Sequence, residues 1–242
     1  MFRVDSHQRF TPEHPPEHFG PILQRNKFAG SVCVVEAGDD PAVADFDFVM
    51  AIVVREAEGA ELAQWRRLRK FRGALWTGVS GPLEALPHGE TLDLLVRTPD
   101  LPAAARLAER SPERKIVIDH LGCPDIAGGD FAEWARGMAE LARLPHVYCK
   151  LSGLVRVAPA PWNAADLRPY LHHALSCFGP GRLMFGSGWP DCLPEYAWKE
   201  TLAAFTQALG AAPIPMREEL LGGTAARFYG IAVQLNSEEG AA

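Results

Sequence analysis

Imidazole, guanidinium and carboxylate groups follow several short apolar segments of this chain, at positions from which they could act on a small molecule. His7 and Arg9 follow the first such segment, and His120 follows a later one. An imidazole with an ordinary pKa of about 6.5 can move a proton near neutral pH. A guanidinium group can hold a carboxylate or stabilise an oxyanion through charge-assisted hydrogen bonds. These residue types predict a site that combines proton transfer with anion binding.

The elements that would position these groups are short apolar runs that alternate with stretches of helical period, a pattern typical of parallel α/β folds. The strand candidates are residues 2–4, 31–35, 48–54, 73–75, 92–96, 115–118, 147–151 and 183–185. Several are apolar on both faces, as buried parallel strands are. A doubly wound open sheet is the alternative, but no glycine-rich phosphate turn follows the first strand. The sequence therefore predicts a closed (β/α)₈ TIM barrel.

Helical patterns separate most of these strands. They cover residues 59–70, 101–109, 131–144, 164–177, 195–209 and 216–221. Residues 73–89 are rich in Gly and Pro and show no convincing helix, so the barrel should be slightly trimmed in its first half. Pro15 and Pro16 predict an exposed loop around His14 and His18. We expect one domain over residues 1–233 and a disordered polar tail over 234–242.

Composition and charge exclude several classes of protein. The chain has 242 residues, near the usual size of one barrel, and its net charge of −6 argues against a nucleic-acid partner. No run of apolar residues is long enough to span a membrane, and the first residues do not resemble a secretory signal. Five scattered cysteines without CxxC spacing fit reduced thiols. The sequence predicts a cytoplasmic protein with a small-molecule substrate, and a homodimer is the commonest arrangement if the chain is an oligomer.

Residues just after parallel strands meet at the mouth of a barrel, whatever their separation in sequence. The catalytic candidates are His7, Glu36, His120 and Asp191, and the substrate-binding candidates are Arg9, Trp76, Arg97, Lys150, Ser152 and Trp189. Glu36 or Asp191 could orient a histidine or act as a base, Lys150 could polarise a carbonyl, and Trp189 could form a flat apolar wall. Alternatively, Arg9 and Glu36 form an ion pair, and Lys150 and Ser152 mainly shape the end of the barrel.

Several ordered motifs connect these positions to a known family. They are Asp5-Ser6-His7, residues 117–124 (VIDHLGCP), 149–154 (CKLSGL), 178–190 (FGPGRLMFGSGWP) and 225–230 (AARFYG). With these motifs the chain resembles the amidohydrolase-related family, in particular its sugar-lactonase-like branch. The resemblance implies a barrel hydrolase that acts on C–O or C–N bonds of small cyclic or carboxylated substrates, often with a divalent metal.

Three positions depart from the family pattern. The family ends its first strand in His-x-His and its eighth in Ser-Asp-Trp-Pro, whereas here Arg9 replaces the second His and Gly188 replaces the Asp. Leu75 stands where the family commonly places a substrate-binding Arg. A guanidinium cannot be deprotonated and would repel a cation. The departures therefore disfavour zinc and predict no metal ligands and no cofactor, although Asp191 and Glu36 could rebuild a carboxylate site.

The expectation is thus an enzyme, an amidohydrolase-related and metal-independent hydrolase of a lactone or a similar small cyclic or carboxylated compound. Hydrolysis, the reverse ring closure and proton transfer next to a carbonyl all suit these groups, and the sequence does not rank them. The alternative is a diverged barrel that binds a small acidic ligand or a partner without turnover.

Overall fold

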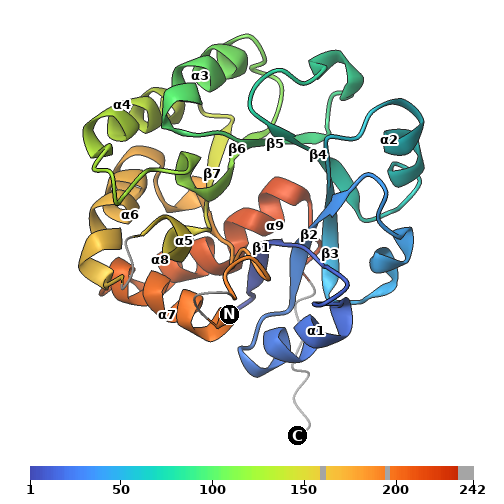
Figure 1. The fold of residues 1–242 in the computed structure, drawn as a ribbon, viewed down its shortest axis with the longest axis horizontal. Coiled ribbons are helices and arrows are strands. Elements are labelled where there is room, and N and C mark those ends of the chain that lie inside the picture. The colour runs from blue at the N-terminus through green and yellow to red at the C-terminus, as the bar shows by residue number, and fades with distance from the viewer. Residues whose placement is uncertain (159–161, 194–196, 234–242) are drawn as a thin grey trace, which may run out of the picture.

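Eight parallel strands form the core of the molecule in the order β1 to β8 (Figure 1). The computed structural model describes residues 1–158, 162–193 and 197–233. The strands are β1 (Val4–Gln8), β2 (Gly30–Glu36), β3 (Val49–Arg55), β4 (Phe71–Thr77), β5 (Thr91–Leu95), β6 (Ile116–Ile118), β7 (Val147–Leu151) and β8 (Leu183–Phe185). Just past β8, Gly188 N donates to His7 O and Arg9 N donates to Trp189 O, both at 2.9 Å. These bonds nearly close the ring, and the predicted TIM barrel is confirmed.

Helices surround the strands unevenly. The α-helices are α1 (Pro16–Arg25), α2 (Gly59–Trp65), α3 (Leu101–Glu109), α4 (Phe131–Ala142), α5 (Leu154–Val157), α6 (Ala164–Phe178), α7 (Trp198–Leu209), α8 (Ile214–Glu218) and α9 (Thr224–Tyr229). The described connections from β2 to β3 and from β4 to β5 hold only the short 3₁₀ turns Pro41–Asp45 and Leu83–Ala85. The first half of the barrel is therefore trimmed, as the sequence predicted.

The first strand lies later in the chain than the pattern predicted. It covers Val4–Gln8 rather than residues 2–4, and all of its residues are buried. Its polar side chains hid it from a search for apolar runs, but all of them are buried, and Asp5, His7 and Gln8 have partners. The Asp5 carboxylate accepts from the backbone N of Ser187 at 2.8 Å and from the indole Nε1 of Trp198 at 2.9 Å. His7 is consequently a residue within the strand, not one that follows it.

The prediction of a loop after the first strand was also wrong. Residues 16–25 form helix α1, with Pro15 at its N-cap and Pro16 in its first turn. Proline is tolerated there because the first helical N–H groups have no partner within the helix. The buried side chains of Phe19 and Leu23 hold α1 against the barrel.

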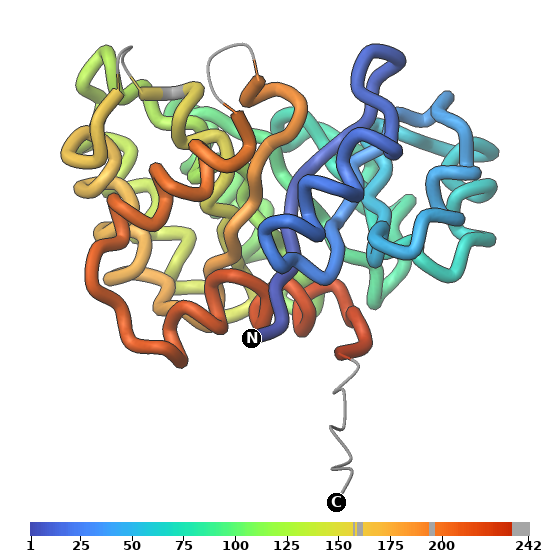
Figure 2. The backbone as a smooth tube through the Cα atoms, turned by 90° about the horizontal axis from the view of Figure 1, so that it is seen from below, coloured from blue at the N-terminus to red at the C-terminus, as the bar shows by residue number. Residues whose placement is uncertain are grey.

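The two ends of the barrel differ in how they are closed. Helix α9 covers the N-terminal end, where Phe228 and Tyr229 pack against barrel-interior residues such as Val4, Val53 and Met184. Figure 2 shows the first residues of the chain and the end of α9 together at this end. The predicted disordered tail, residues 234–242, lies outside the described residues. Among the helices that are described, none is long and apolar enough to cross a membrane.

Candidate active site

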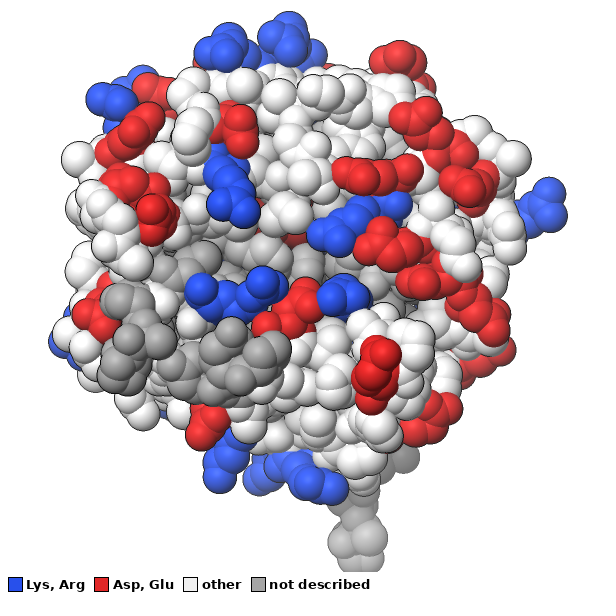
Figure 3. Space-filling model, viewed as in Figure 1, with Lys and Arg blue, Asp and Glu red and all other residues white. Residues whose placement is uncertain are grey.

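A cavity of about 570 Å³ opens at the C-terminal mouth of the barrel. Basic side chains gather around the central hollow of this face in Figure 3. The described ionisable residues of the cavity wall are His7, Arg9, Arg55, Arg97, His120, Cys123, Asp125, Arg156 and Asp191. The fold thus brings together five of the residues predicted from the sequence, namely His7, Arg9, Arg97, His120 and Asp191. They converge because all eight strands end at this face.

The two histidines of the wall lie against one another. The ring centroids of His7 and His120 are 4.5 Å apart, and His120 Nδ1 lies 2.7 Å from the Ser152 hydroxyl. Burial and then the charge of Lys150 hold the pKa of His7 well below its ordinary value. Burial, Lys150 and Arg156 lower the pKa of His120 to about 3. Both imidazoles are therefore neutral near neutral pH, able to accept one proton and to donate one hydrogen bond.

A left-handed turn after β6 carries His120. The backbone has positive φ at His120 (51°), Leu121 (54°) and Cys123 (44°), a conformation that residues other than glycine rarely adopt. The indole of Trp134 donates to Leu121 O at 2.6 Å and holds the turn. A Cβ atom at Gly153 would lie 3.1 Å from the His120 ring, so glycine leaves space for it. Backbone strain at such a turn is typical of functional sites.

A fully buried ion cluster lies beneath the histidines, inside the barrel. Lys150 Nζ is 2.6 Å from Asp93 Oδ2, 2.9 Å from Asp119 Oδ1 and 3.2 Å from His7 Nδ1. Tyr229 donates its hydroxyl to Asp93 at 2.7 Å. Burial lowers the pKa of Lys150, but the two carboxylates raise it more, so the ammonium group stays charged. Burial raises the pKa of Asp93 to about 6 despite this ammonium.

Asp93 and Asp119 were not among the predicted site residues. Asp93 interrupts the apolar strand β5, and a charge at a fully buried strand position needs a partner. That signal could have identified it. Lys150 and Ser152 were predicted to bind substrate, but they lie under the histidines: each is at most 1% exposed, and neither lines the cavity.

Arg9 and Asp191 form a bidentate ion pair between the segments that follow the first and the last strand. Arg9 Nε is 3.1 Å from Asp191 Oδ2, and Arg9 Nη2 is 2.5 Å from Oδ1. Arg156 Nη1 approaches Asp191 Oδ2 at 3.7 Å. Burial raises the pKa of Asp191, but the bonds and charge of Arg9 outweigh it, so the pKa is lowered. The alternative pairing of Arg9 with Glu36 was wrong, because Glu36 pairs with Arg55 at 3.1 Å.

Three further predicted residues, besides Lys150 and Ser152, do not line the cavity. Glu36 is exposed at the end of β2. Trp76 lies within β4 and is buried, its ring against Gly81. Trp189 is buried as well, and its ring packs against Phe19, with centroids 4.8 Å apart. Aromatic residues near strand ends were assigned to the cavity from spacing alone, but apolar packing takes both tryptophans away from it.

Comparison with known proteins places the chain in a family. The amidohydrolase family model matches residues 2–231. The chain belongs to the amidohydrolase family. The resemblance predicted from the motifs is confirmed, and so is the expectation of a hydrolase.

This amidohydrolase is similar to an L-fucono-1,5-lactonase of Burkholderia multivorans, with 30% identity over 95% of this chain and 96% of the relative. Two crystal structures of an amidohydrolase from Burkholderia multivorans, one with bound HEPES and one with bound zinc, share 28% identity with it. Their TM-scores are 0.82 and 0.81, and each alignment covers 96% of this chain and 100% of the other.

Three candidate metal ligands of this amidohydrolase lie together beside the buried lysine. Ligand atoms of His7, Asp119 and His120 lie within 4.8 Å of one another. The Lys150 ammonium group contacts His7 Nδ1 and Asp119 Oδ1, whereas Asp119 Oδ2 lies 3.4 Å from His7 Nδ1 and accepts no hydrogen bond from the described residues. At Gly188, which replaces the family's Asp, an added Cβ would meet only Gly153 N at 3.8 Å, but φ is +69°. A side chain would have room there, on a backbone that Asp and Asn tolerate better than most residues.

Proposed function

We propose that this amidohydrolase hydrolyses the ester bond of a small lactone that carries a carboxylate, without a divalent metal. The observation that carries the proposal is the cavity wall, in whose described part four arginines surround two neutral histidines and two carboxylates oppose them. Such a wall is unusual in a chain of net charge −6, and it favours an anionic ligand. The similarity to a lactonase supports ester C–O cleavage as the reaction.

Arginines would bind the carboxylate of the substrate. Arg97 and Arg156 are exposed at the rim; within the described part of the chain Arg97 makes no ion pair, and Arg156 makes only the 3.7 Å contact with Asp191. Arg9 offers a planar fork that fits a carboxylate, and Asp191 already occupies it in that manner. A substrate carboxylate that takes this fork would release Asp191 and remove the cause of its lowered pKa. Asp191 then becomes a stronger base beside the bound substrate.

The histidines would move the proton. In the reaction a water molecule attacks the lactone carbonyl, the ring C–O bond breaks, and the products are a carboxylate and a hydroxyl group. Burial, Lys150 and Arg156 lower the pKa of His120, and an anionic substrate would offset the two charges, so that His120 becomes a better acceptor for the proton of the water. Ser152 fixes the ring of His120 by the bond at Nδ1. His7 would face the developing oxyanion, while Lys150 acts through His7 and does not touch the substrate.

The donor set does not suit a divalent ion. The Lys150 ammonium group neutralises Asp119 and lies 3.2 Å from His7 Nδ1, the atom that faces this cluster. Arg9 stands in the place of the family's second His and adds a further positive charge. An ion bound here would need to overcome both charges, and the family's Asp is absent at Gly188.

The proposal is tested with a panel of neutral sugar lactones and carboxylated lactones in metal-free buffer. We expect turnover of a carboxylated lactone, and a loss of kcat/KM of about a hundredfold or more in His120→Ala because the proton acceptor is removed. Arg168→Gln, an exposed change on α6 outside the cavity wall, is the control and should not alter kcat/KM. Hydrolysis of neutral lactones alone, or equal activity in wild type and His120→Ala, contradicts the proposal.

Metal independence is tested by elemental analysis and by assay after dialysis against a chelator. Activity should persist without stoichiometric metal. The double variant Arg9→His/Gly188→Asp restores the family pattern and serves as the positive control, which should retain zinc. One equivalent of zinc in the wild type, lost together with activity, would refute a metal-free reaction.

Binding without turnover is the second candidate, favoured by Gly188 and by the engagement of Asp191 with Arg9. A carboxylated lactone that raises the melting temperature but is never hydrolysed would support it, since a ligand of the native state stabilises by RT ln(1 + [L]/Kd).

A further inference from the structure

A second cavity, of about 1020 Å³, lies at the N-terminal end of the barrel, opposite the mouth. We call it the basal pocket. Its wall comes from the segments that precede or begin β1 to β4 and from residues 230–233 after α9. None of its lining residues is a His, Cys, Ser, Thr or Tyr, so the wall offers mainly positive charge and apolar surface. Its chemistry is that of a binding site.

The basal pocket has an excess of positive charge. Its basic residues are Arg3, Lys27, Arg69, Lys70 and Arg72, and Asp47 is the acid in its wall. None of these five cations makes an ion pair within the described ranges. In a chain of net charge −6, such a group of cations without carboxylate partners is a local reversal of the overall charge.

Several of these cations are held in place by backbone carbonyl groups. Lys70 Nζ donates to Phe46 O at 2.9 Å, and Arg72 donates to Tyr229 O at 2.5 Å and to Arg69 O at 2.7 Å. Carbonyl groups orient a cation but do not neutralise its charge. Burial accordingly lowers the pKa of Lys70 and of Arg72. An anion in the basal pocket would remove this electrostatic cost.

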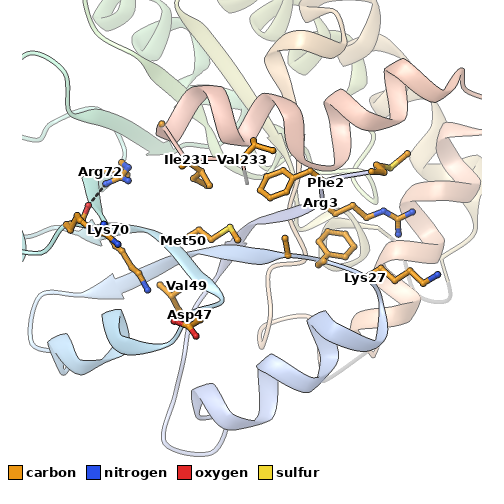
Figure 4. A pocket seen from close by; sticks show the side chains of 16 residues that line it. Phe2, Arg3, Lys27, Asp47, Val49, Met50, Lys70, Arg72, Ile231 and Val233 are labelled. Carbon is orange, nitrogen blue, oxygen red and sulfur yellow. Dashed lines mark hydrogen bonds between the residues drawn. The ribbon is translucent and has the colours of Figure 1, made fainter. Parts of the chain in front are cut away.

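Apolar side chains separate two groups of cations. In Figure 4, Lys70 and Arg72 lie on one side of the basal pocket, Arg3 and Lys27 lie on the other, and Phe2, Met50 and Ile231 lie between them. Val233, at the rim, is 43% exposed. An apolar surface with basic edges fits a molecule that has both an apolar body and an anionic group.

We infer that the basal pocket binds a small organic anion with an apolar body, such as an alkyl or aryl carboxylate. The apolar body would lie on Phe2, Met50 and Ile231, and the carboxylate would meet the cations at the edge. The site is independent of the proposed lactone hydrolysis because its residues lie at the other end of the barrel from the catalytic cavity. A ligand here would be an effector or a stabiliser of the fold, not a substrate.

The test is calorimetric titration of the full chain with octanoate, compared with 1-octanol and octylammonium, which keep the apolar body and change only the charge. We expect octanoate to bind at one site per chain, more weakly as salt is raised because screening weakens the charge contacts. Lys27→Glu and Arg69→Glu should each weaken binding by about tenfold or more, the effect of losing one charge-assisted contact. Arg67→Glu makes the same charge change at an exposed residue outside the basal pocket and should leave binding unchanged.

Different results would overturn the inference and identify what the basal pocket does instead. If 1-octanol binds as tightly as octanoate, the cations of the basal pocket do not contribute to binding. If Arg67→Glu weakens octanoate binding as much as Arg69→Glu does, binding depends on the overall charge of the surface and not on contacts within the basal pocket. Tighter octanoate binding by a chain without residues 234–242 assigns the basal pocket to that segment, which carries Glu238 and Glu239. A dimer in sedimentation that Arg69→Glu dissociates assigns it to a second copy. Lactone turnover should stay within about twofold in Lys27→Glu and Arg69→Glu, so failure of either proposal leaves the other testable.

Discussion

The cations at the two ends of the barrel differ in the groups that they contact. At the mouth, Arg9 meets Asp191 and Arg55 meets Glu36, so these two guanidinium groups already have a carboxylate that a ligand would have to replace. At the basal pocket, the side-chain hydrogen bonds that Lys70 and Arg72 make within the described residues go to backbone carbonyl groups. A cation paired with a carboxylate is already oriented to bind an anion, but its positive charge is largely neutralised by that carboxylate. The positive charge of a cation bound only by carbonyl groups is not neutralised. The comparison therefore indicates that an anionic ligand at the mouth replaces a carboxylate of the chain. An anionic ligand in the basal pocket would instead compensate positive charge that has no carboxylate partner.

The largest expected effect comes from the lysine that lies between the two ends. Lys150→Met leaves Asp93 and Asp119 buried without their cation, which should reduce the free energy of unfolding by about 3–5 kcal/mol at neutral pH. Lys115 is the matched control: it lies at the basal end, is exposed, and its ammonium group donates to the carbonyl groups of Arg227 and Phe228 without an ion pair to any described residue. Lys115→Met should change stability by about 0.5 kcal/mol or less. Urea unfolding measures both, and equal effects would remove the distinction between paired and carbonyl-bound lysines.

An intermediate effect is expected for a rim arginine of the mouth. Arg156→Gln removes a charge that faces the cavity and should raise the KM for a carboxylated lactone by about tenfold to a hundredfold, the equivalent of one charged hydrogen bond. The kcat should change little, because the contact is present before and during the reaction. Steady-state kinetics on carboxylated and neutral lactones would measure it. The same loss with a neutral lactone would mean that Arg156 shapes the site and does not bind the carboxylate.

The smallest expected effect concerns pH and the neutral histidines of the mouth. His120 has a pKa of about 3 in the folded chain and 6.5 as its ordinary value. Between these values the unfolded chain takes up a proton that the folded chain does not, so His120 lowers stability as pH falls below 6.5. In His120→Gln, the loss of unfolding free energy from pH 7 to pH 5 should be smaller, by at most about 1.4 kcal/mol per pH unit.

The buried carboxyl of Asp93 acts in the opposite direction. Its pKa is raised from 3.8 to about 6, so it favours the folded chain at acid pH, but it is present in both proteins and cancels in the comparison. Urea unfolding at the two pH values, with a chelator present, gives the difference. Identical losses in wild type and His120→Gln would show that the imidazole is not kept neutral by the fold.

The sequence predicted the barrel because apolar runs and helical periods are local patterns that survive without tertiary information. It failed at β1, where Asp5 and His7 are polar but buried among partners from distant segments. It failed at α1 because two adjacent prolines were interpreted as helix breakers, although they lie where a helix begins. Strand ends correctly placed His7, His120 and Arg9 at one mouth, since parallel strands share an end. The positions of the strand ends could not show that the side chains of Trp76 and Trp189 pack among apolar residues and not in the cavity wall.

By itself, then, the chain determined the parallel barrel, the family and the convergence of two histidines with several arginines at the mouth. Tertiary structure alone decided the partners of these charges. Arg9 and Asp191 are 182 positions apart, and Asp93 and Lys150 are 57 apart. No local pattern encodes such pairs, because an ion pair depends on which side chains the closed sheet brings within a few ångströms of each other. The basal pocket depends in the same way on the closure of the fold, since its wall joins the first residues of the chain to those after the last helix.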